Sequence, residues 1–407
     1  MKARRLPALE SGHEVALLAG AHEYFPALVE AIDHSRHEVR LETYIFDPQG
    51  TGAQVVEALE RAARRGVSVF LVMDGVGTDG LSQIWQRRLT LAGVKWHLFL
   101  PLGRLGLLIP SRWRRLHRKL CVVDGRIAFC GGINILDDWE DANHGTLAAP
   151  RLDFAVRVTG PLVRQVHALL AQFWGRLQGA ERLREADWLQ AWRDLEAAHA
   201  DLDRAMGAQL RLGGQRGVKA ALLLRDNLRN RSGIERAYRK AIAAAREDII
   251  IANAYFLPGR KLRQSLLLAV RRGVRVRLLL QGRYEYFMQY HASRPVYATL
   301  LKAGIEIYEY APSFLHAKVA VIDGHWATVG SSNLDPLSLL LAREANVVID
   351  DAGFARDLQH ALVHAMEREG RAVSETAMLA RPLLQRGLDA LAYVSMRLAL
   401  LFLGRRY

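Results

Sequence analysis

Apolar and polar positions follow one order twice along the chain. A strand is predicted over 41–46, helical spacing covers 55–65, and an apolar strand ends at Asp74. The same order recurs as a strand over 248–258, a helix that begins at Leu262, and an apolar strand that ends before Gly282. Each helix ends in Arg-Arg-Gly, which places cations at the negative end of the helix dipole and a glycine at the cap. The chain therefore contains an internal repeat.

A second pair of matching blocks follows, at Leu116–Ile135 and Leu315–Leu334. Each block has two short apolar strands joined by Asp-Gly, which is a strong hairpin signal. Strands that alternate with helices predict an α/β protein with two pseudo-symmetric α/β/α sandwich lobes and mixed sheets. We expect lobes over 1–177 and 216–372, a helical connector over 178–215, and a C-terminal amphipathic helix over 373–407.

Composition narrows the classes of protein. Half of the 407 residues are hydrophobic, 24% are charged, and the net charge is +14, which favours a polyanionic partner such as nucleic acid or an anionic membrane surface. The two cysteines, Cys121 and Cys130, exclude a disulfide scaffold and are expected to be buried free thiols in a reducing compartment. We see no signal peptide and no uncharged apolar run long enough for a membrane span.

The two hairpin blocks carry the same polar residues at the same spacing. The copies are His117, Lys119, Asp124, Gly131, Gly132 and Asn134, then His316, Lys318, Asp323, Gly330, Ser331 and Asn333. Residues i and i+2 of a strand share a face, so each histidine and its lysine project together. Lysine charge and asparagine N–H groups suit a phosphoryl group, one histidine attacking phosphorus while the other protonates the leaving oxygen. Because the two histidines have different roles, we expect one active site shared by both halves. The sequence has no cluster of ligands at zinc spacing, so we expect no metal or other cofactor.

These blocks resemble the paired HKD motifs of the phospholipase D superfamily. The resemblance covers about 12–370, and the stretch 110–139 is similar to bacterial cardiolipin synthases, nearest to the B type. The resemblance implies that His117 is the nucleophile and His316 the acid/base. It assigns phosphate binding to Lys119, Lys318, Asn134, Asn333, Ser331 and Gly132, although Gly132 lacks the usual serine hydroxyl. Asp124 and Asp323 complete the catalytic motifs, chiefly as hairpin supports, and Asp153 and Glu344 are expected to orient the histidines.

Two segments are predicted to contact a membrane. The stretch 96–115 is apolar and includes Arg112, Arg114 and Arg115, so we interpret it as an interfacial lip, with a buried loop as the alternative. Near the C-terminus, Arg386, Asp389, Tyr393 and Arg397 fall on one side of a helix whose other positions are apolar. This predicts an interfacial helix with Arg405 and Arg406 at the head groups, and a helix packed on the protein is the alternative.

The resulting hypothesis is a cardiolipin synthase. It would transfer a phosphatidyl group from phosphatidylglycerol or another phospholipid to a hydroxyl of a second phospholipid and release glycerol. Its expected partners are an anionic phospholipid membrane and phosphatidylglycerol, at the cytoplasmic side of the bacterial inner membrane. A phospholipase D-type hydrolase and a nuclease are alternatives, since basic and aromatic residues over 272–290 could stack bases. A non-catalytic membrane-binding protein is disfavoured because both motifs are intact.

Overall fold

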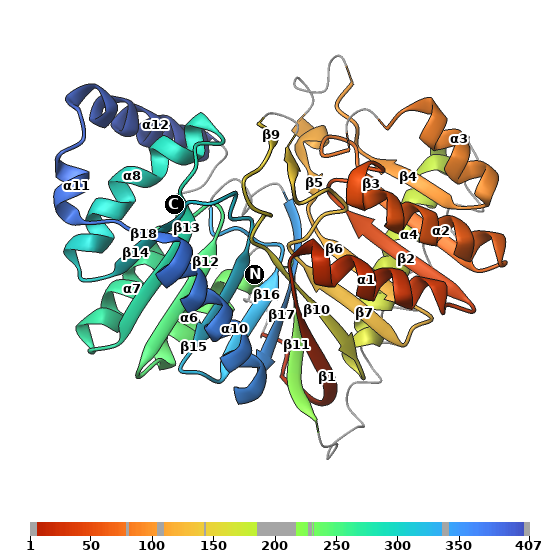
Figure 1. Cartoon of the computed structure of the whole chain (residues 1–407), viewed down its shortest axis with the longest axis horizontal. Helices are drawn as coiled ribbons and strands as arrows, with labels where there is room; N and C mark the ends of the chain where they lie inside the picture. Colours follow the sequence, from red (N-terminus) through yellow and green to blue (C-terminus); the bar gives the residue numbers. More distant parts are fainter. Residues whose placement is uncertain are drawn as a thin grey trace. The chain divides into compact units, whose positions relative to one another are not determined.

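The computed structural model describes residues 6–78, 81–103, 110–141, 144–184, 217–226, 230, 232–335 and 342–402. Contacts divide the chain into two compact units, which we name after the motif that each contains. The first-motif unit comprises Pro7–Asp137 and Ala155–Leu222, and the second-motif unit comprises Met1–Leu6, Asp138–Phe154 and Leu223–Tyr407. Each unit combines helices with a mixed sheet, which confirms the predicted α/β class (Figure 1).

The sheet of the first-motif unit has the strand order β11-β1-β10-β7-β6-β2-β3-β4. Strands β2, β3 and β4 are parallel to one another, whereas β6, β7 and β10 are antiparallel to their neighbours. The bounds are β1 Glu10–Ala19, β2 Glu38–Thr43, β3 Ser68–Asp74, β4 Lys95–Phe99, β6 Lys119–Val123, β7 Ile127–Gly131, β10 Phe154–Thr159 and β11 Val218–Arg225. The helices are α1 Gly20–Asp33, α2 Ala53–Arg64, α3 Gln83–Ala92 and α4 Leu162–Arg184.

The second-motif unit repeats this arrangement with the order β18-β14-β13-β12-β15-β16-β17. Its central strands match β4-β3-β2-β6-β7 in order and direction, which confirms the internal repeat. The bounds are β12 Asp248–Asn253, β13 Arg275–Gln281, β14 Glu306–Tyr310, β15 Lys318–Ile322, β16 Trp326–Gly330, β17 Ala342–Asp350 and β18 Gly370–Ala372. The helices are α6 Gly233–Ala244, α7 Arg260–Arg271, α8 Phe287–Lys302, α10 Ala352–His364, α11 Glu375–Leu379 and α12 Leu383–Phe402.

Each unit has its own apolar core between helices and one face of the sheet. In the first-motif unit, Phe25 and Leu28 of α1 and Leu59 of α2 pack on buried residues of β2, β3 and β6. Those strand residues include Cys121, and both cysteines are buried free thiols as predicted. The other face of this sheet carries α4, where Phe173 packs with Phe99 and Leu116. Burial on both faces explains why the central strands are almost continuously apolar.

The Asp-Gly dipeptides form the predicted hairpin turns. Asp124 and Asp323 both have φ of +50°, and the glycines that follow have φ of +62° and +63°. Aspartate tolerates this left-handed backbone better than most residues, and two consecutive positive φ values define the tight hairpin turn. Each carboxylate also accepts three backbone N–H bonds, at 2.8–2.9 Å for Asp124 from residues 36–38 and 2.9–3.1 Å for Asp323 from residues 246–248. The motif aspartates therefore tie each hairpin to the start of β2 or β12.

Helix α12 packs against α8 in the second-motif unit (Figure 1). Asp389, Ala392 and Met396 are buried, and the Asp389 carboxylate contacts His291 Nδ1 at 2.6 Å and Arg381 Nε at 3.2 Å. Asp389 thus belongs to an internal ion network, although the helical projection placed it with solvent-facing residues. The opposite side of the helix exposes an apolar stripe formed by Leu383, Leu384, Leu391, Val394 and Leu398. Arg405 and Arg406 lie outside the described residues.

Replacing Asp124 by Asn tests the structural role of the motif aspartate. Asn can keep the positive φ, but it loses the charge that strengthens three N–H bonds, so D124N is expected to lower the free energy of unfolding by about 1–2 kcal/mol. Urea denaturation followed by circular dichroism would measure the change, with the exposed substitution E57Q as the matched control. Equal stability of D124N and E57Q would contradict this role.

Candidate active site

Each motif histidine lies just before the first strand of its hairpin. Lys119 begins β6 and Lys318 begins β15, and both lysine side chains are buried. Lys119 Nζ donates a 2.9 Å hydrogen bond to the carbonyl oxygen of His117, and Lys318 Nζ donates to that of His316. The lysine therefore holds the backbone of its own histidine, in addition to supplying charge. The sequence analysis expected the side chains of each pair to project together, whereas the contact seen here is from the lysine side chain to the histidine backbone.

Lys318 is a fully buried cation. Burial lowers the pKa of Lys318 to about 8, because the charged form loses its hydration. The negative charges of Asp153, Glu344, Glu285 and Asp335 oppose this fall. Four carboxylates of the second-motif unit therefore favour the ammonium form of its buried lysine.

Asp153 contacts the ring of His316. Its Oδ2 atom lies 2.6 Å from His316 Nδ1, and because an ionised carboxylate only accepts, Nδ1 carries the proton. In the neutral ring this leaves Nε2 unprotonated and able to take a proton or attack an electrophile. Asp153 is 4% exposed and also accepts the backbone N–H of Phe154, so its position is fixed from two sides.

The segment that carries Asp153 follows the first motif in sequence but belongs to the second-motif unit. Leu152 bridges Leu315, accepting from the backbone N–H of His316 at 2.9 Å and donating to the carbonyl of Phe314 at 3.0 Å. His144 places its ring 4.9 Å from that of Phe314. The described residues of 138–154 thus contact the second histidine and the residues before it. The repeat pattern of the sequence does not predict this placement.

The remaining predicted residues are buried beside the hairpins. Asn134 Oδ1 accepts from the backbone N–H of Ile45 at 3.1 Å, whereas in the second half Asn253 accepts from the N–H of Leu334. Asn333 is 2% exposed. The hydroxyl of Ser331 donates to Glu344 at 2.5 Å, so its proton is engaged within the protein. Gly132 is buried and offers no such hydroxyl.

The second-motif glycine Gly330 permits a close approach between β16 and β17. A Cβ atom on Gly330 would lie 2.3 Å from the side chain of Asn346 and 2.5 Å from the carbonyl oxygen of Ala345. Such distances are far inside van der Waals contact, so only glycine fits at this point of β16.

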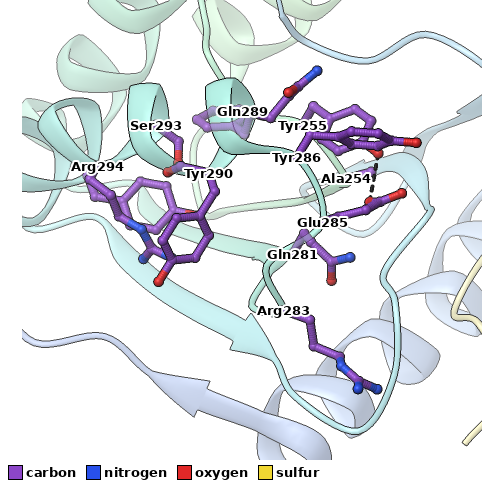
Figure 2. A pocket seen from close by; sticks show the side chains of 12 residues that line it. Ala254, Tyr255, Gln281, Arg283, Glu285, Tyr286, Gln289, Tyr290, Ser293 and Arg294 are labelled. Atoms are coloured by element: carbon purple, nitrogen blue, oxygen red, sulfur yellow. Dashed lines mark hydrogen bonds between the residues drawn. The ribbon is translucent and has the colours of Figure 1, made fainter. Parts of the chain in front are cut away.

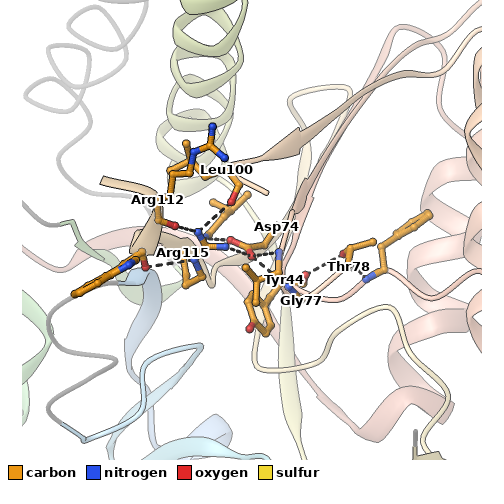
Figure 3. Close-up of polar contacts among 11 residues, drawn as sticks. Tyr44, Asp74, Gly77, Thr78, Leu100, Arg112 and Arg115 are labelled. Carbon is orange, nitrogen blue, oxygen red and sulfur yellow. Dashed lines mark hydrogen bonds and ion pairs between the residues drawn. The ribbon is translucent and has the colours of Figure 1, made fainter. Parts of the chain in front are cut away.

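Two positioning residues escaped the sequence analysis. Asp74 ends β3 and is fully buried, and its Oδ2 accepts from the backbone N–H of Leu116, next to His117, at 2.7 Å (Figure 3). Gln281 ends β13 at the matching place of the repeat, and its Oε1 accepts from the N–H of Leu315, next to His316, at 3.0 Å. The signal was present: a polar residue closes the apolar strand before glycine in both repeats.

Two of the arginines expected at head groups have internal partners instead. Arg115 Nη1 contacts Asp74 at 3.0 Å and Arg115 Nη2 donates to the carbonyl of Leu100 at 3.1 Å (Figure 3). Arg112 donates to the carbonyl of Leu102 at 3.0 Å. Arg114 is exposed, and residues 104–109 of the predicted lip lie outside the described residues. Arg112 and Arg115 therefore support the chain that leads into the first motif.

The halves differ in what packs beside the histidine. Tyr44 directly follows β2 and places its ring 4.9 Å from the ring of His117, with Lys119 Nζ 5.3 Å from the tyrosine ring. Ala254 directly follows β12 and is the matching residue of the second repeat. Alanine therefore stands in the second repeat at the position of the tyrosine that contacts His117.

Neither a metal cluster nor a membrane span is found in the described part of the chain. No group of three or more His, Cys, Asp or Glu side chains there could hold a metal ion. None of its helices is long and apolar enough to cross a bilayer.

Comparison with known proteins gives consistent matches. The family described as "Cardiolipin synthase, PLD-like domain" matches residues 28–149 and 238–366. Cardiolipin synthase B of Escherichia coli strain K12 is 38% identical over 369 residues, which cover 90% of this chain and 84% of that protein. The protein of the same name from Salmonella typhimurium is 37% identical over 369 residues. In fold, a phosphatidylserine synthase from Haemophilus influenzae covers 96% of both chains with a TM-score of 0.67 at 12% identity.

The repeated fold and its two His-Lys hairpins define a phosphatidyltransferase of the phospholipase D superfamily. Within that superfamily, the chain belongs to the cardiolipin synthase family. The family resemblance drawn from the motifs is therefore confirmed.

Activity is expected to fall at alkaline pH because of Lys318. Its ammonium form predominates below its pKa of about 8 and is lost above it, so kcat/KM should fall about tenfold for each further pH unit. The pH profile of the free enzyme, together with NMR titration of labelled lysine side chains in the native protein and in K318M, would locate this ionisation. A kcat/KM that stays constant to pH 10 would contradict the prediction.

Proposed function

We propose that this protein makes cardiolipin by transferring the phosphatidyl group of phosphatidylglycerol to a hydroxyl of a second phospholipid. The observation that carries the proposal is the pair of buried His-Lys hairpins in a chain 38% identical to proteins named cardiolipin synthase B. Family membership supports the reaction class, and we propose phosphatidylglycerol as the donor lipid.

The first chemical step is attack of a ring nitrogen of His117 on phosphorus. The P–N bond forms and the P–O bond to glycerol breaks. His316 enters this step as an imidazolium with protons on both Nδ1 and Nε2, and it protonates the departing oxygen from Nε2. Hydrogen bonding of Nδ1 to Asp153 supports Nε2 of His316 as the atom that delivers this proton. Lys119 and Lys318 neutralise the phosphoryl oxygens, with Asn134 and Asn333 as donors beside them.

In the second step a lipid hydroxyl attacks the phospho-histidine. The new P–O bond forms, the P–N bond breaks, and the hydroxyl proton passes to Nε2 of His316, which restores both histidines. Asp124 and Asp323 act here only through the hairpins, since their carboxylates are bonded to backbone N–H groups at the far end of β6 and β15. Glu344 is proposed as a histidine-orienting residue that also accepts from Ser331.

Transfer rather than hydrolysis also needs a lipid environment that excludes water. We propose that the protein is peripheral, on the cytoplasmic side of the inner membrane, and that the apolar stripe of α12 enters the interface. The stripe is exposed on a helix that is already fixed to α8 by the Asp389 ion network. Large apolar side chains held in water in this way favour insertion among acyl chains.

Lipid analysis tests the reaction. Phosphatidylglycerol vesicles mixed with the protein in EDTA are expected to yield cardiolipin and glycerol in equal amounts. H117A should lower the rate by about 10³-fold or more, because the nucleophile is removed. Thin-layer separation and mass spectrometry give the products. Phosphatidic acid alone would favour the hydrolase, and an unchanged lipid with cleaved DNA in a parallel tube would reject the proposal in favour of the nuclease.

Vesicle flotation tests the membrane contact. L391E places a carboxylate in the apolar stripe and is expected to reduce binding to phosphatidylglycerol vesicles by about tenfold or more, because a charge must then enter the interface. Q385E adds the same charge on the same helix at an exposed position outside the stripe and serves as the control. Equal flotation of both variants and the native protein would reject α12 as the contact.

A further inference from the structure

The second-motif unit contains a pocket where the first half of the repeat has a tyrosine. Ala254 lies in its wall at the place matching Tyr44, and the pocket is a partly open hollow on this unit (Figure 2). The other principal wall residues are Tyr255, Gln281, Arg283, Glu285 and Tyr286. Loss of the aromatic ring in one repeat therefore coincides with a polar, concave surface.

This pocket lies next to the stretch of chain that leads into the second histidine. Gln281 contributes to its wall while its Oε1 accepts from the backbone N–H of Leu315, the residue before His316. Arg283 lies with its guanidinium 5.2 Å from the ring of Phe314. Glu285 is one of the carboxylates whose charge acts on Lys318. A ligand in the pocket would thus lie next to Phe314 and Leu315, the residues that directly precede the histidine to which the proton transfers are assigned.

The polar groups of the pocket are fixed in place. Tyr255 donates a 2.7 Å hydrogen bond to the Glu285 carboxylate, which leaves further lone pairs of that carboxylate as acceptors (Figure 2). Helix α8 supplies Gln289 and Tyr290 to the same pocket, and Arg294 on that helix is paired with Glu309. The tyrosine rings offer apolar faces next to these polar atoms.

We infer that this pocket binds the alcohol side of the reaction, a small uncharged polyol such as the glycerol headgroup of a phospholipid. Adjacent carboxylate, amide and tyrosine groups can accept from and donate to neighbouring hydroxyls, and Arg283 can meet an attached phosphate. Arg283 and Lys318 oppose an ammonium headgroup by like charge. The inference rests on the proposed function, because the polyol is the group that leaves or attacks at phosphorus.

The chemistry agrees with this location. When the bound hydroxyl attacks the phospho-histidine, its oxygen bonds to phosphorus, the P–N bond breaks, and its proton goes to His316 Nε2. An alcohol held by its other hydroxyls beside His316 is oriented for that proton transfer. A monohydric alcohol or water lacks those additional bonds and is expected to compete poorly.

Competition between acceptors tests the inference with the full-length protein. Phosphatidylglycerol vesicles are incubated with equal concentrations of deuterated glycerol and 1-propanol, and mass spectrometry measures labelled phosphatidylglycerol, phosphatidylpropanol and phosphatidic acid. The native protein should favour glycerol over propanol. E285Q removes the carboxylate, and A254Y installs the residue of the first repeat in the pocket. Both should lower the glycerol-to-propanol product ratio by about fivefold or more.

The control is E367Q, an equal charge change at an exposed position of the same unit, which should leave the ratio unchanged. Circular dichroism identifies a variant that fails to fold, and E285Q carries the test if A254Y does so. A ratio unchanged in E285Q would overturn the pocket assignment. So would a native protein that prefers ethanolamine to glycerol as acceptor. If the native protein forms no phosphatidyl product at all, the proposed function itself fails, and this result is distinct from an unchanged ratio.

Discussion

The buried ammonium group of Lys318 sets the main constraint on the second-motif unit. Moving a cation out of water is unfavourable by several kcal/mol unless opposite charges and hydrogen bonds replace its hydration. Here the carbonyl of His316 accepts from Nζ, and four carboxylates act on the charge. The same carboxylates make further contacts, since Asp153 is hydrogen-bonded to His316 Nδ1 and Glu285 lines the pocket. The same groups therefore stabilise the charge of the lysine and form the surroundings of the histidine and the pocket.

The repeat accounts for the shared framework, and its departures account for the distinct chemistry. In both halves a polar side chain at the end of a strand accepts from the backbone N–H of the residue before the histidine. In the first half this side chain is the carboxylate of Asp74, which is also paired with Arg115, whereas in the second half it is the neutral amide of Gln281. The residues that directly follow β2 and β12 occupy matching positions but differ in their surroundings. Tyr44 contacts the ring of His117, whereas Ala254 lines the pocket. Two histidines with unequal surroundings are suited to unequal tasks, as a nucleophile and an acid/base require.

Much of the framework could be predicted because short-range patterns determine it. The strand–helix–strand order, the Asp-Gly turns and the proximity of each lysine to its histidine follow from periodicities of 3.6 and 2. The predicted strands at 41–46 and 248–258 end earlier in the structure, at Thr43 and Asn253, because the chain leaves the sheet there to reach the site.

Long-range choices were not predictable from one sequence. Nothing in the residues of 138–154 indicates that they join the second-motif unit, and nothing in the helical projection of α12 indicates that Asp389 bonds to His291. Arg112 and Arg115 likewise belong to a segment whose composition is typical of a membrane-contacting loop. In the structure, however, their side chains contact a carbonyl and a carboxylate of the protein itself. Tertiary partners decided these positions, and such partners leave no local periodic signal.

Because residues 138–154 belong to the second-motif unit, they affect where the chain could be cut into fragments. A fragment that begins at the second repeat would contain His316, Lys318 and their hairpin, but it would lack Asp153 and the wall formed by Leu152. Its histidine would have no carboxylate from this segment to set its tautomer. The second repeat taken alone would therefore fold, if it folds, without part of the surroundings of its own histidine, and the chain between the two motifs must be kept with it for the site to be complete.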